Sequence, residues 1–389
     1  MERITLKGER HACGGPGQFI LGRAEDVCPM LLQSYAGQVQ LIYLDPPFGT
    51  GDTFTMQSGG KKSVTIPTYA DTLNADAYLA MMRAVLLACY EMLSEDGSLY
   101  LHVDYRKSAV LRVLLDEIFG EKNFVNEIIW AYKSGGRSTK HYSRKHDNIL
   151  FYRKSPKQYF DIQSIGVPRG PVRRNHMKRG VDDLGRVYYS IRANGKTYTY
   201  DEDTLVYPSD VWDDIEHLHQ RDPERTGYST QKPEALLRRI IGASSRPGDL
   251  VMDLFSGSGT TAAVAAKMDR AWVAADASPI ALCMLRKRLL GAHQEFSLFD
   301  TSHAMAFTYE LGDLAASGMT AKKTESSICA SVQEDAALRY VALGHDENGI
   351  FLPATHTFFP KAGDTLRAAP QENVLQAVDA YGRQGFWSL

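Results

Sequence analysis

The segment from Asp249 to Leu290 restricts the possible folds most, because its pattern predicts two consecutive strand–helix units. A glycine-rich turn connects the strand and the helix of the first unit. The apolar residues of the segment form two short runs, and between and after these runs they recur at helical spacing. Two consecutive strands with a helix between them pair in parallel, since the helix carries the chain back to the starting edge. The expected elements are a strand at Asp249–Leu254, a helix at Gly259–Met268, a strand at Ala271–Asp276 and a helix at Pro279–Leu290.

The turn after the first of these strands has the composition of a nucleoside-binding site. Gly257 and Gly259 let the backbone pass under a ligand without a Cβ in the way. Asp276 ends the next strand, about 20 residues on, where a carboxylate can accept both ribose hydroxyls. Ala262 stands where a dinucleotide-binding motif has its third glycine, which disfavours NAD as a ligand. The motif does not decide which nucleoside cofactor binds. The expected cofactor-binding residues here are Asp253, Phe255, Gly257, Gly259, Thr260 and Asp276.

Similar alternation precedes this unit. Strands are expected at Gln40–Leu44, Ser98–Val103 and Asn148–Tyr152, and helices at Asp76–Leu93, Ala109–Phe119 and Gln231–Ala243, the last opened by Pro233. Between about Arg153 and Arg225 the pattern breaks, and no long helix can be drawn there. These alternating strands and helices predict an α/β fold with a doubly wound, mostly parallel, Rossmann-like sheet. The fold would carry an inserted irregular region and a C-terminal extension.

The strand at 40–44 runs into Asp45-Pro46-Pro47-Phe48, and these four residues are the candidate catalytic group. The prolines stiffen the strand exit and remove two backbone donors, so the Asp45 carboxylate and the Pro46 carbonyl are free acceptors. Two acceptors on an aromatic amino group favour a pyramidal nitrogen, and fixed dipoles stabilise the charge that grows on it. Phe48 can stack on a base drawn out of a duplex. The simpler alternative is a proline turn after a strand.

We expect the strand before Asp45 and the strand before Phe255 to be neighbours. Ligands of open α/β sheets bind at the carboxyl ends of strands, where the strand order reverses. Neighbouring strands at that point would bring the two motifs into one crevice, although some 200 residues separate them.

Charge is unevenly distributed along a chain whose net charge is only −2. Residues 130–192 hold 15 Lys and Arg against 4 Asp and Glu, a local net charge of +11. Residues 292–389 carry 6 basic and 12 acidic residues, a net −6. A basic segment in an otherwise acidic chain is typical of a surface that binds phosphates, and the alternative is a solvated basic loop.

These motifs together resemble the beta-class DNA amino-methyltransferases, over roughly Phe19 to Leu290. The D-P-P-F motif comes first and the F-x-G-x-G motif at Phe255 last, which is the order of that class. Between them lie further matches at Phe119-Gly120, Asn126–Trp130, Arg144–Asp147 and Ser229–Pro233. The resemblance implies a methyltransferase that moves a methyl group from S-adenosylmethionine to adenine N6 in double-stranded DNA, by base flipping and direct transfer. It also implies that Thr230, Lys232 and Pro233 help to hold the methionine part of this cofactor.

By the same resemblance, the irregular basic region is the target-recognition region. Its candidates for phosphate contacts are Lys133, Arg137, Lys140, Arg144 and Lys145, and its candidates for base or backbone contacts are Arg173, Arg174, Lys178 and Arg179. One departure concerns the Gly-Asp that often precedes the D-P-P strand: here Gly22 is followed by Arg23. The acidic contact to the cofactor's adenine is therefore unassigned, with Glu25 and Asp26 as substitutes.

The expected division of the chain has four parts. Residues 1–152 and 226–291 form the two parts of the methyltransferase domain, 153–225 the target-recognition region, and 292–389 an extension of unknown role. A homodimer and a separately encoded restriction subunit are both compatible with the resemblance. No membrane span is expected, and five separated cysteines favour a reducing compartment. The resemblance implies that this compartment is a prokaryotic or phage-type cytoplasm. No metal is expected, because neither His11 with Cys13 nor His217 with His219 has a second ligand pair at metal spacing.

Other activities fit parts of this sequence pattern less well. Cytosine N4 methylation is the first alternative, although aspartate at position 45 leans towards adenine. Cytosine C5 methylation is disfavoured because no cysteine follows a proline, and protein-glutamine methylation because it would favour asparagine at position 45 and needs no basic insert. A catalytically silent DNA-binding subunit is disfavoured by intact Asp45, Phe48, Gly257 and Asp276.

Overall fold

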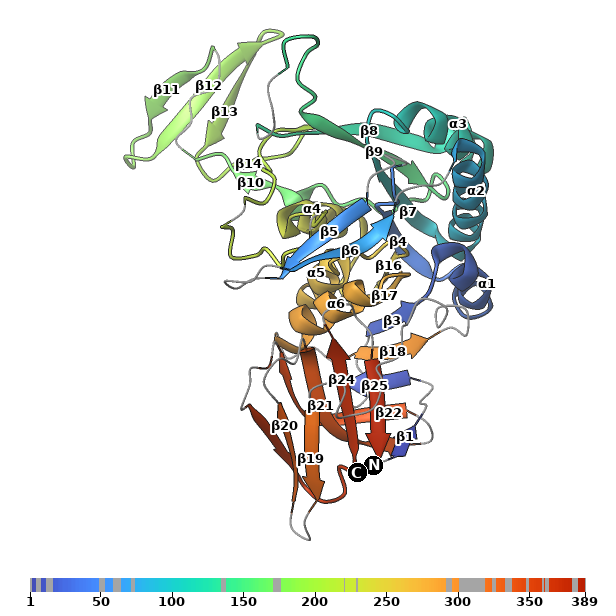
Figure 1. The fold of residues 1–389 in the computed structure, drawn as a ribbon. Helices are drawn as coiled ribbons and strands as arrows, with labels where there is room; N and C mark the ends of the chain where they lie inside the picture. The colour runs from blue at the N-terminus through green and yellow to red at the C-terminus, as the bar shows by residue number, and fades with distance from the viewer. Residues whose placement is uncertain are drawn as a thin grey trace.

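The computed structural model describes most of the chain, and Figure 1 shows its course. The described residues are 2–4, 8–11, 17–48, 53–58, 64–70, 74–133, 138–170, 176–219, 221–228, 230–291, 296–300, 319–323, 327–332, 338–347, 350–358, 360, 364–379 and 384–388.

The centre of the molecule is a mostly parallel sheet. Eight of its strands run the same way, and they are β3 (Gly17–Leu21), β4 (Val39–Leu44), β7 (Leu93–Val103), β8 (Phe124–Ala131), β15 (Val211–Trp212), β16 (Leu250–Asp253), β17 (Ala271–Asp276) and β18 (Phe296–Asp300). Strand β9 (His146–Arg153) lies antiparallel between β7 and β8. The spatial order is β18-β3-β17-β16-β4-β7-β9-β8-β15. The predicted α/β class and mostly parallel sheet are therefore confirmed.

Helices cover both faces of this sheet (Figure 1). On one face lie α1 (Ala24–Tyr35), α2 (Ala75–Met92) and α3 (Ser108–Phe119), and on the other lie α4 (Glu234–Ser244), α5 (Thr260–Lys267) and α6 (Pro279–Gly291). Alternation along β4 divides the core between these faces: Ile42 and Leu44 pack with α1–α3, while Leu41 and Tyr43 pack with α4–α6. Burial on both faces explains why β4 is apolar throughout.

The strand order reverses between β16 and β4. From β16 the chain proceeds through α5 to β17 on one side, and from β4 it proceeds through α2 to β7 on the other. The two strands pair in parallel, with Val251 opposite Leu41 and Met252 opposite Ile42. The expectation that they are neighbours is confirmed, and their carboxyl ends meet at the position where α/β sheets bind ligands.

The irregular region contains short strands and, as expected, no long helix among its described residues. A three-stranded sheet of β11 (Lys178–Val181), β12 (Val187–Ala193) and β13 (Lys196–Asp201) stands away from the main sheet in Figure 1. A smaller pair joins β10 (Val167–Pro168) to β14 (Leu205–Val206), and the 3-10 turns η1 and η2 span Glu121–Asn123 and Gln163–Ile165. Elsewhere, β5 (Thr53–Ser58) and β6 (Val64–Ala70) form a hairpin.

Sequence reasoning did not anticipate that the two ends of the chain share one sheet. Strand β1 (Glu2–Ile4) pairs with β25 (Gln384–Ser388), and β2 (Gly8–His11) lies between β18 and β22 (Ile350–Phe358). Strands β21 (Leu338–Glu347) and β24 (Val374–Asp379) complete this extension, which continues the main sheet beyond β18. Both termini lie in this lower part of Figure 1. A separate three-stranded sheet holds β19 (Met319–Lys323), β20 (Ile328–Val332) and β23 (Thr365–Ala368).

The expected elements agree with the observed ones to within a few residues, apart from β7. That strand begins at Leu93, where the helix had been expected to end, and so starts before the expected strand at Ser98–Val103. Pro233 is the N-cap of α4 and precedes the helix, where the sequence had placed it in the first turn.

Candidate active site

Asp45 leaves the end of β4 directly beside the end of β16. Because Met252 lies opposite Ile42, the chain reaches Asp253 and Phe255 at the same edge as Asp45. Pro46 is buried, and Asp45, Pro47 and Phe48 are half-buried. The Phe48 ring packs against the core on the α1–α3 face. The catalytic candidates and the glycine-rich turn thus belong to neighbouring strands.

The closest partner of Asp45 is Lys232. Its Nζ lies 2.5 Å from Asp45 Oδ2, and the two side chains are only 11% and 15% exposed. The same Nζ is 5.8 Å from the centre of the Phe48 ring. The main chain of Lys232 is tied to the cofactor turn, because Thr260 Oγ1 donates a hydrogen bond of 3.1 Å to its carbonyl oxygen. Lys232 therefore connects the two candidate groups, and Oδ1 of Asp45 remains as an acceptor.

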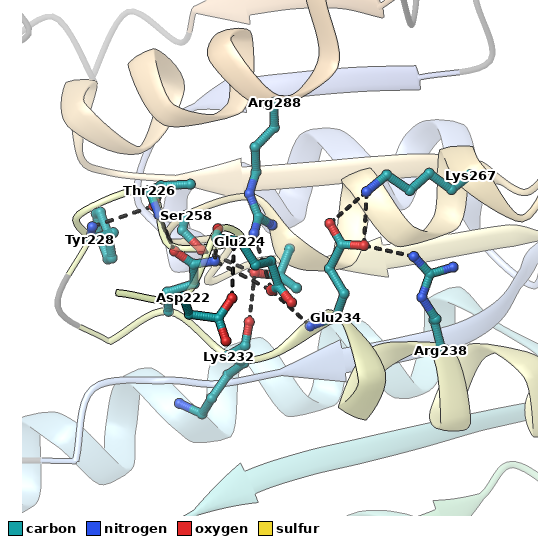
Figure 2. A network of polar contacts seen from close by, with 12 residues as sticks. Asp222, Glu224, Thr226, Tyr228, Lys232, Glu234, Arg238, Ser258, Lys267 and Arg288 are labelled. Carbon is teal, nitrogen blue, oxygen red and sulfur yellow. Dashed lines mark hydrogen bonds and ion pairs between the residues drawn. The ribbon is translucent and has the colours of Figure 1, made fainter. Parts of the chain in front are cut away.

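A polar network fixes the segment that carries Lys232 (Figure 2). Gln231 Nε2 donates to the Glu224 carbonyl oxygen at 2.9 Å, and its Oε1 accepts from both the backbone and the hydroxyl of Thr226 at 2.8 Å. The Glu224 carboxylate accepts the backbone N–H of Glu234 at 2.9 Å, which satisfies one free donor at the start of α4. Lys232 is thereby presented by a rigid loop.

Basic side chains from the neighbouring helices hold this network against the sheet. Arg288 of α6 lies 3.5 Å from Glu224, while Lys267 of α5 and Arg238 of α4 pair with Glu234 at 2.6 and 2.8 Å (Figure 2). Glu224 and Glu234, which flank the segment carrying Lys232, are in this way fastened to α4, α5 and α6. The predicted Thr230 and Pro233 lie in the same stretch, on either side of Gln231 and Lys232.

The glycine-rich turn adopts the conformation that its sequence requires. Gly257 and Gly259 have φ values of 51° and 75°, in the left-handed region that glycine tolerates best. A Cβ at Gly259 would lie 2.6 Å from Leu285 Cδ1, so a larger residue at this position would force the Leu285 side chain on α6 to move. The backbone consequently turns under the space above the strand ends without side chains in the way.

Two carboxyl groups support this turn, of which Asp253 is buried and Asp276 is half-buried. Asp253 accepts from Thr261 Oγ1 at 2.5 Å and from the backbone of Phe255 at 3.0 Å, which makes it a brace within the turn. Asp276 accepts the backbone N–H groups of Gly257 at 2.7 Å and Ser278 at 2.8 Å, one on each oxygen. Burial raises the pKa of Asp253 to about 7 and that of Asp276 to about 6. Each Asp276 oxygen keeps further acceptor capacity, as binding of two ribose hydroxyls requires.

The substitute for the missing acid after Gly22 stays unassigned. Gly22 donates its backbone N–H to the Asp276 carbonyl oxygen at 2.9 Å, so this loop does lie beside the cofactor turn. Glu25, however, is paired with Arg23 at 2.5 Å, and Asp26 is exposed.

Beside Lys232 lies a buried polar chain that sequence reasoning missed. The Tyr43 hydroxyl is 2.8 Å from His102 Nδ1, and His102 Nε2 is 3.2 Å from Asp147 Oδ2. Burial opposes ionisation of Asp147, but its hydrogen bond to His102 and the charges of His102 and Lys232 keep its pKa below the usual value. Burial, followed by the charge of Asp45, raises the pKa of Tyr43 well above its usual range. The signal available in the sequence was His102, a polar residue on the inward face of an apolar strand.

A cluster of aromatic rings packs beside this polar chain. The His217 ring lies 4.4 Å from that of Trp130 and 4.0 Å from that of Tyr132, whose hydroxyl donates to Asp147 at 3.3 Å. Burial lowers the pKa of His217 to about 4, so this ring is neutral at pH 7. The rings pack tilted and edge-on against one another, Trp130 is fully buried, and His217 is near enough to Lys232 for that charge to lower the His217 pKa further.

The predicted DNA-contacting residues fall into three groups. Lys133, Lys140, Arg144 and Lys145 lie between β8 and β9, after the carboxyl end of β8 and hence at the same sheet edge as Asp45. Lys178 and Arg179 are exposed on β11 in the outlying sheet. Arg137, Arg173 and Arg174 lie outside the described residues.

Comparison with known proteins agrees with this geometry. A protein-family profile described as DNA methylase matches residues 39–283, from the start of β4 into α6. The chain belongs to this N6/N4 DNA methylase family.

Individual proteins are also similar in sequence to this DNA methylase. The type II methyltransferase M.EcaI of Enterobacter cloacae is 31% identical over 298 residues, which cover 64% of each chain and thus just under two thirds of M.EcaI. The type II methyltransferase M.HpaI of Haemophilus parainfluenzae is 30% identical over 264 residues, covering 68% of this chain and 71% of its own. The DNA adenine methyltransferase YhdJ of Escherichia coli (strain K12) is 31% identical over 241 residues, covering 61% and 71%.

Two further findings concern the described residues alone. They contain no group of three or more His, Cys, Asp or Glu side chains arranged to hold a metal ion. No helix among them is both long and apolar enough to span a membrane.

The Asp45–Lys232 pair predicts strong coupling between the two residues. In a double-mutant cycle with Asp45→Asn and Lys232→Met, we expect a coupling free energy of roughly 1 to 3 kcal/mol, because each single change leaves a largely desolvated partner. Chemical denaturation of the four proteins measures it. The control cycle uses Arg83 and Glu117, an ion pair with 47% and 59% exposed side chains, where the coupling should be much smaller. Additive effects of the Asp45 and Lys232 changes would contradict the observed pair.

Proposed function

We propose that this DNA methylase transfers a methyl group from S-adenosylmethionine to N6 of adenine in double-stranded DNA, on a base turned out of the helix. The observation that carries the proposal is the pairing of β4 with β16, which sets Asp45 beside the glycine-rich turn. One of these strands ends in hydrogen-bond acceptors for the target base, and the other ends in a turn that can bind a nucleoside cofactor. A methyl group can then pass directly from cofactor to base, without a covalent enzyme intermediate. Aspartate at position 45 and the similarity to the adenine methyltransferase YhdJ favour adenine over cytosine N4.

The residues around the turn fit the proposed cofactor. The Asp276 carboxylate has acceptor capacity for ribose hydroxyls, and the turn at Gly257 and Gly259 leaves room for the ligand. Phe255 and Thr260 flank that turn, and Thr230, Lys232 and Pro233 lie across from it through the Thr260–Lys232 hydrogen bond. S-Adenosylmethionine supplies an electrophilic methyl group on a sulfonium. Asp253 acts as a brace for this turn.

Asp45 and the Pro46 carbonyl are proposed to accept the two N–H groups of the exocyclic amine. Accepting both favours the pyramidal nitrogen, whose lone pair can form the new N–C bond, and Asp45 stabilises the positive charge that develops there. The new N–C bond would replace the bond between the methyl group and the sulfonium sulfur, so the donor would leave as the neutral thioether S-adenosylhomocysteine, and the methylated amine would release one proton to water. Lys232 limits the negative charge on Asp45 before the base arrives, and Phe48 offers a ring for stacking.

The basic residues between β8 and β9 are proposed to bind DNA phosphates. Lys140 and Arg144 are suited to this role because they rise from the edge where the target base must arrive. Lys133 and Lys145 support the loop instead: Lys145 Nζ donates to the Lys133 carbonyl oxygen at 3.0 Å, and Lys133 pairs with Glu216 at 3.5 Å. Lys178 and Arg179 on the outlying sheet are proposed as further contacts in the target-recognition region.

Methylation in cells tests the proposed reaction. Single-molecule sequencing of DNA from cells that express the chain should show N6-methyladenine at one recurrent motif, and Asp45→Ala should remove that signal while DNA binding persists. N4-methylcytosine at a recurrent motif would support the proposed active site but show that the methylated base is cytosine. No modification with the unsubstituted chain, or an unchanged signal with Asp45→Ala, would contradict the proposal.

Salt dependence tests the phosphate contacts. Reversing charge at Lys140 and Arg144 together should weaken duplex binding and reduce the slope of log K against log salt concentration by about 2, since each lost contact removes nearly one released counterion. Fluorescence anisotropy at several salt concentrations measures this slope. Lys122→Glu is the control, because Lys122 is exposed before β8 at the opposite edge of the sheet. A slope equal to that of the control would remove both residues from the interface.

A further inference from the structure

The loop between β8 and β9 presents an aromatic side chain that the proposed chemistry leaves unused. Tyr142 is 98% exposed, the highest value among the exposed large apolar and aromatic side chains of the described residues. The backbone around it is ordered by local hydrogen bonds: Ser138 Oγ accepts the N–H groups of Lys140 and His141 at 3.3 Å. His141 Nδ1 donates to the Tyr142 carbonyl oxygen at 2.9 Å. The ring therefore projects into solvent from a bent segment whose backbone is held by local hydrogen bonds.

The base of this loop is continuous with the active site. Tyr132 donates its backbone N–H to the Lys145 carbonyl oxygen at 2.9 Å, which closes the loop above the ends of β8 and β9. The Tyr132 hydroxyl then reaches Asp147, whose carboxylate is close enough to Lys232 to feel its charge. A short series of contacts thus links the loop carrying Tyr142 to the Asp45–Lys232 pair. Both arise from the carboxyl edge of the same parallel strands.

The surroundings of Tyr142 have the charge and shape of a DNA-binding surface. Lys140 and Arg144 flank it along the chain, and both are exposed or half-exposed. The Arg144 guanidinium lies 4.3 Å from the ring centre of Tyr105, a 43%-exposed residue in the turn after β7. The patch therefore combines cations with two accessible aromatic rings at one sheet edge, which suits a phosphate backbone with bases stacked inside it.

We propose that Tyr142 is the wedge that enters the duplex where the target base leaves it. Turning a base out breaks its stacking on both neighbours and opens a gap in the helix. A rigid aromatic side chain that fills the gap offsets part of that loss, as apolar wedges do in other DNA-bending proteins. Lys140 and Arg144, on either side, hold the flanking phosphates while the ring inserts. The inference rests on the proposed function, and Tyr142 acts as a positioning residue that does not touch the reacting atoms.

The test compares a paired substrate with one in which the target base has no pairing partner and leaves the duplex at a lower cost. The first duplex carries the motif found by methylation sequencing, and the second has an abasic site opposite the target base. Tyr142→Ala should lower kcat/KM about 10-fold on the paired duplex and by less than about 3-fold on the abasic one, because there the base is already unpaired. Tyr142→Phe should restore activity on the paired duplex, since stacking needs the ring and not the hydroxyl. Val113→Ala, at a 68%-exposed side chain on α3, is the control and should leave both values unchanged.

A second readout is independent of methyl transfer. With 2-aminopurine in place of the target adenine, binding of the unsubstituted chain should raise fluorescence as the base unstacks, and Tyr142→Ala should reduce this rise at saturating protein. Equal losses of kcat/KM on both duplexes would make Tyr142 a general DNA contact and overturn the wedge. So would full activity of Tyr142→Ala on the paired duplex. Failure of the proposed function differs from both, since the unsubstituted chain itself would then methylate neither duplex.

Discussion

The parallel pairing of β4 with β16 is the constraint on which the rest of the site depends. Because Ile42 lies opposite Met252, the chain delivers Asp45 and the glycine-rich turn to adjacent places on one sheet edge. A register slip would turn the side chains of β4 to the opposite faces and expose Tyr43 or Leu44 to the wrong core. The same hydrophobic alternation that buries the strand therefore also fixes the relative position of the two chemical groups.

Around this pairing, the polar contacts form a second layer of organisation. Lys232 bridges the two halves through its ion pair with Asp45 and its hydrogen bond from Thr260. The Gln231–Glu224–Glu234 network holds the lysine in place and ties the end of the irregular region to α4, α5 and α6. Contacts thus join the proposed DNA-contacting region to the proposed catalytic edge at two points: at this network, and through Tyr132 and Asp147 at the β8–β9 loop.

Much of this arrangement could be predicted from the sequence, because local periodicity carries it. Strands β4, β7, β9, β16 and β17, helices α2 to α6, the switch point and the family followed from apolar spacing and from the D-P-P-F and F-x-G-x-G motifs. Strand β8, the β5–β6 hairpin and the short strands of the irregular region did not. Pairings between distant segments could not be predicted. Nothing local indicates that Glu2–Ile4 joins Gln384–Ser388, or that Lys232 pairs with Asp45, because these contacts depend on the closed three-dimensional fold. The polar chain from Tyr43 to Asp147 was missed for the same reason, with only His102 as a hint.

The central claim is that one crevice between β4 and β16 holds both the methyl donor and the target base. A crystal structure of the chain with S-adenosylhomocysteine and a duplex carrying its methylated motif tests this most directly. The account predicts the cofactor ribose on Asp276 and an extrahelical adenine whose amino nitrogen is within hydrogen-bond distance of the Asp45 carboxylate and the Pro46 carbonyl oxygen. A cofactor bound away from the Gly257 turn, or a target amino group out of reach of Asp45, would contradict it.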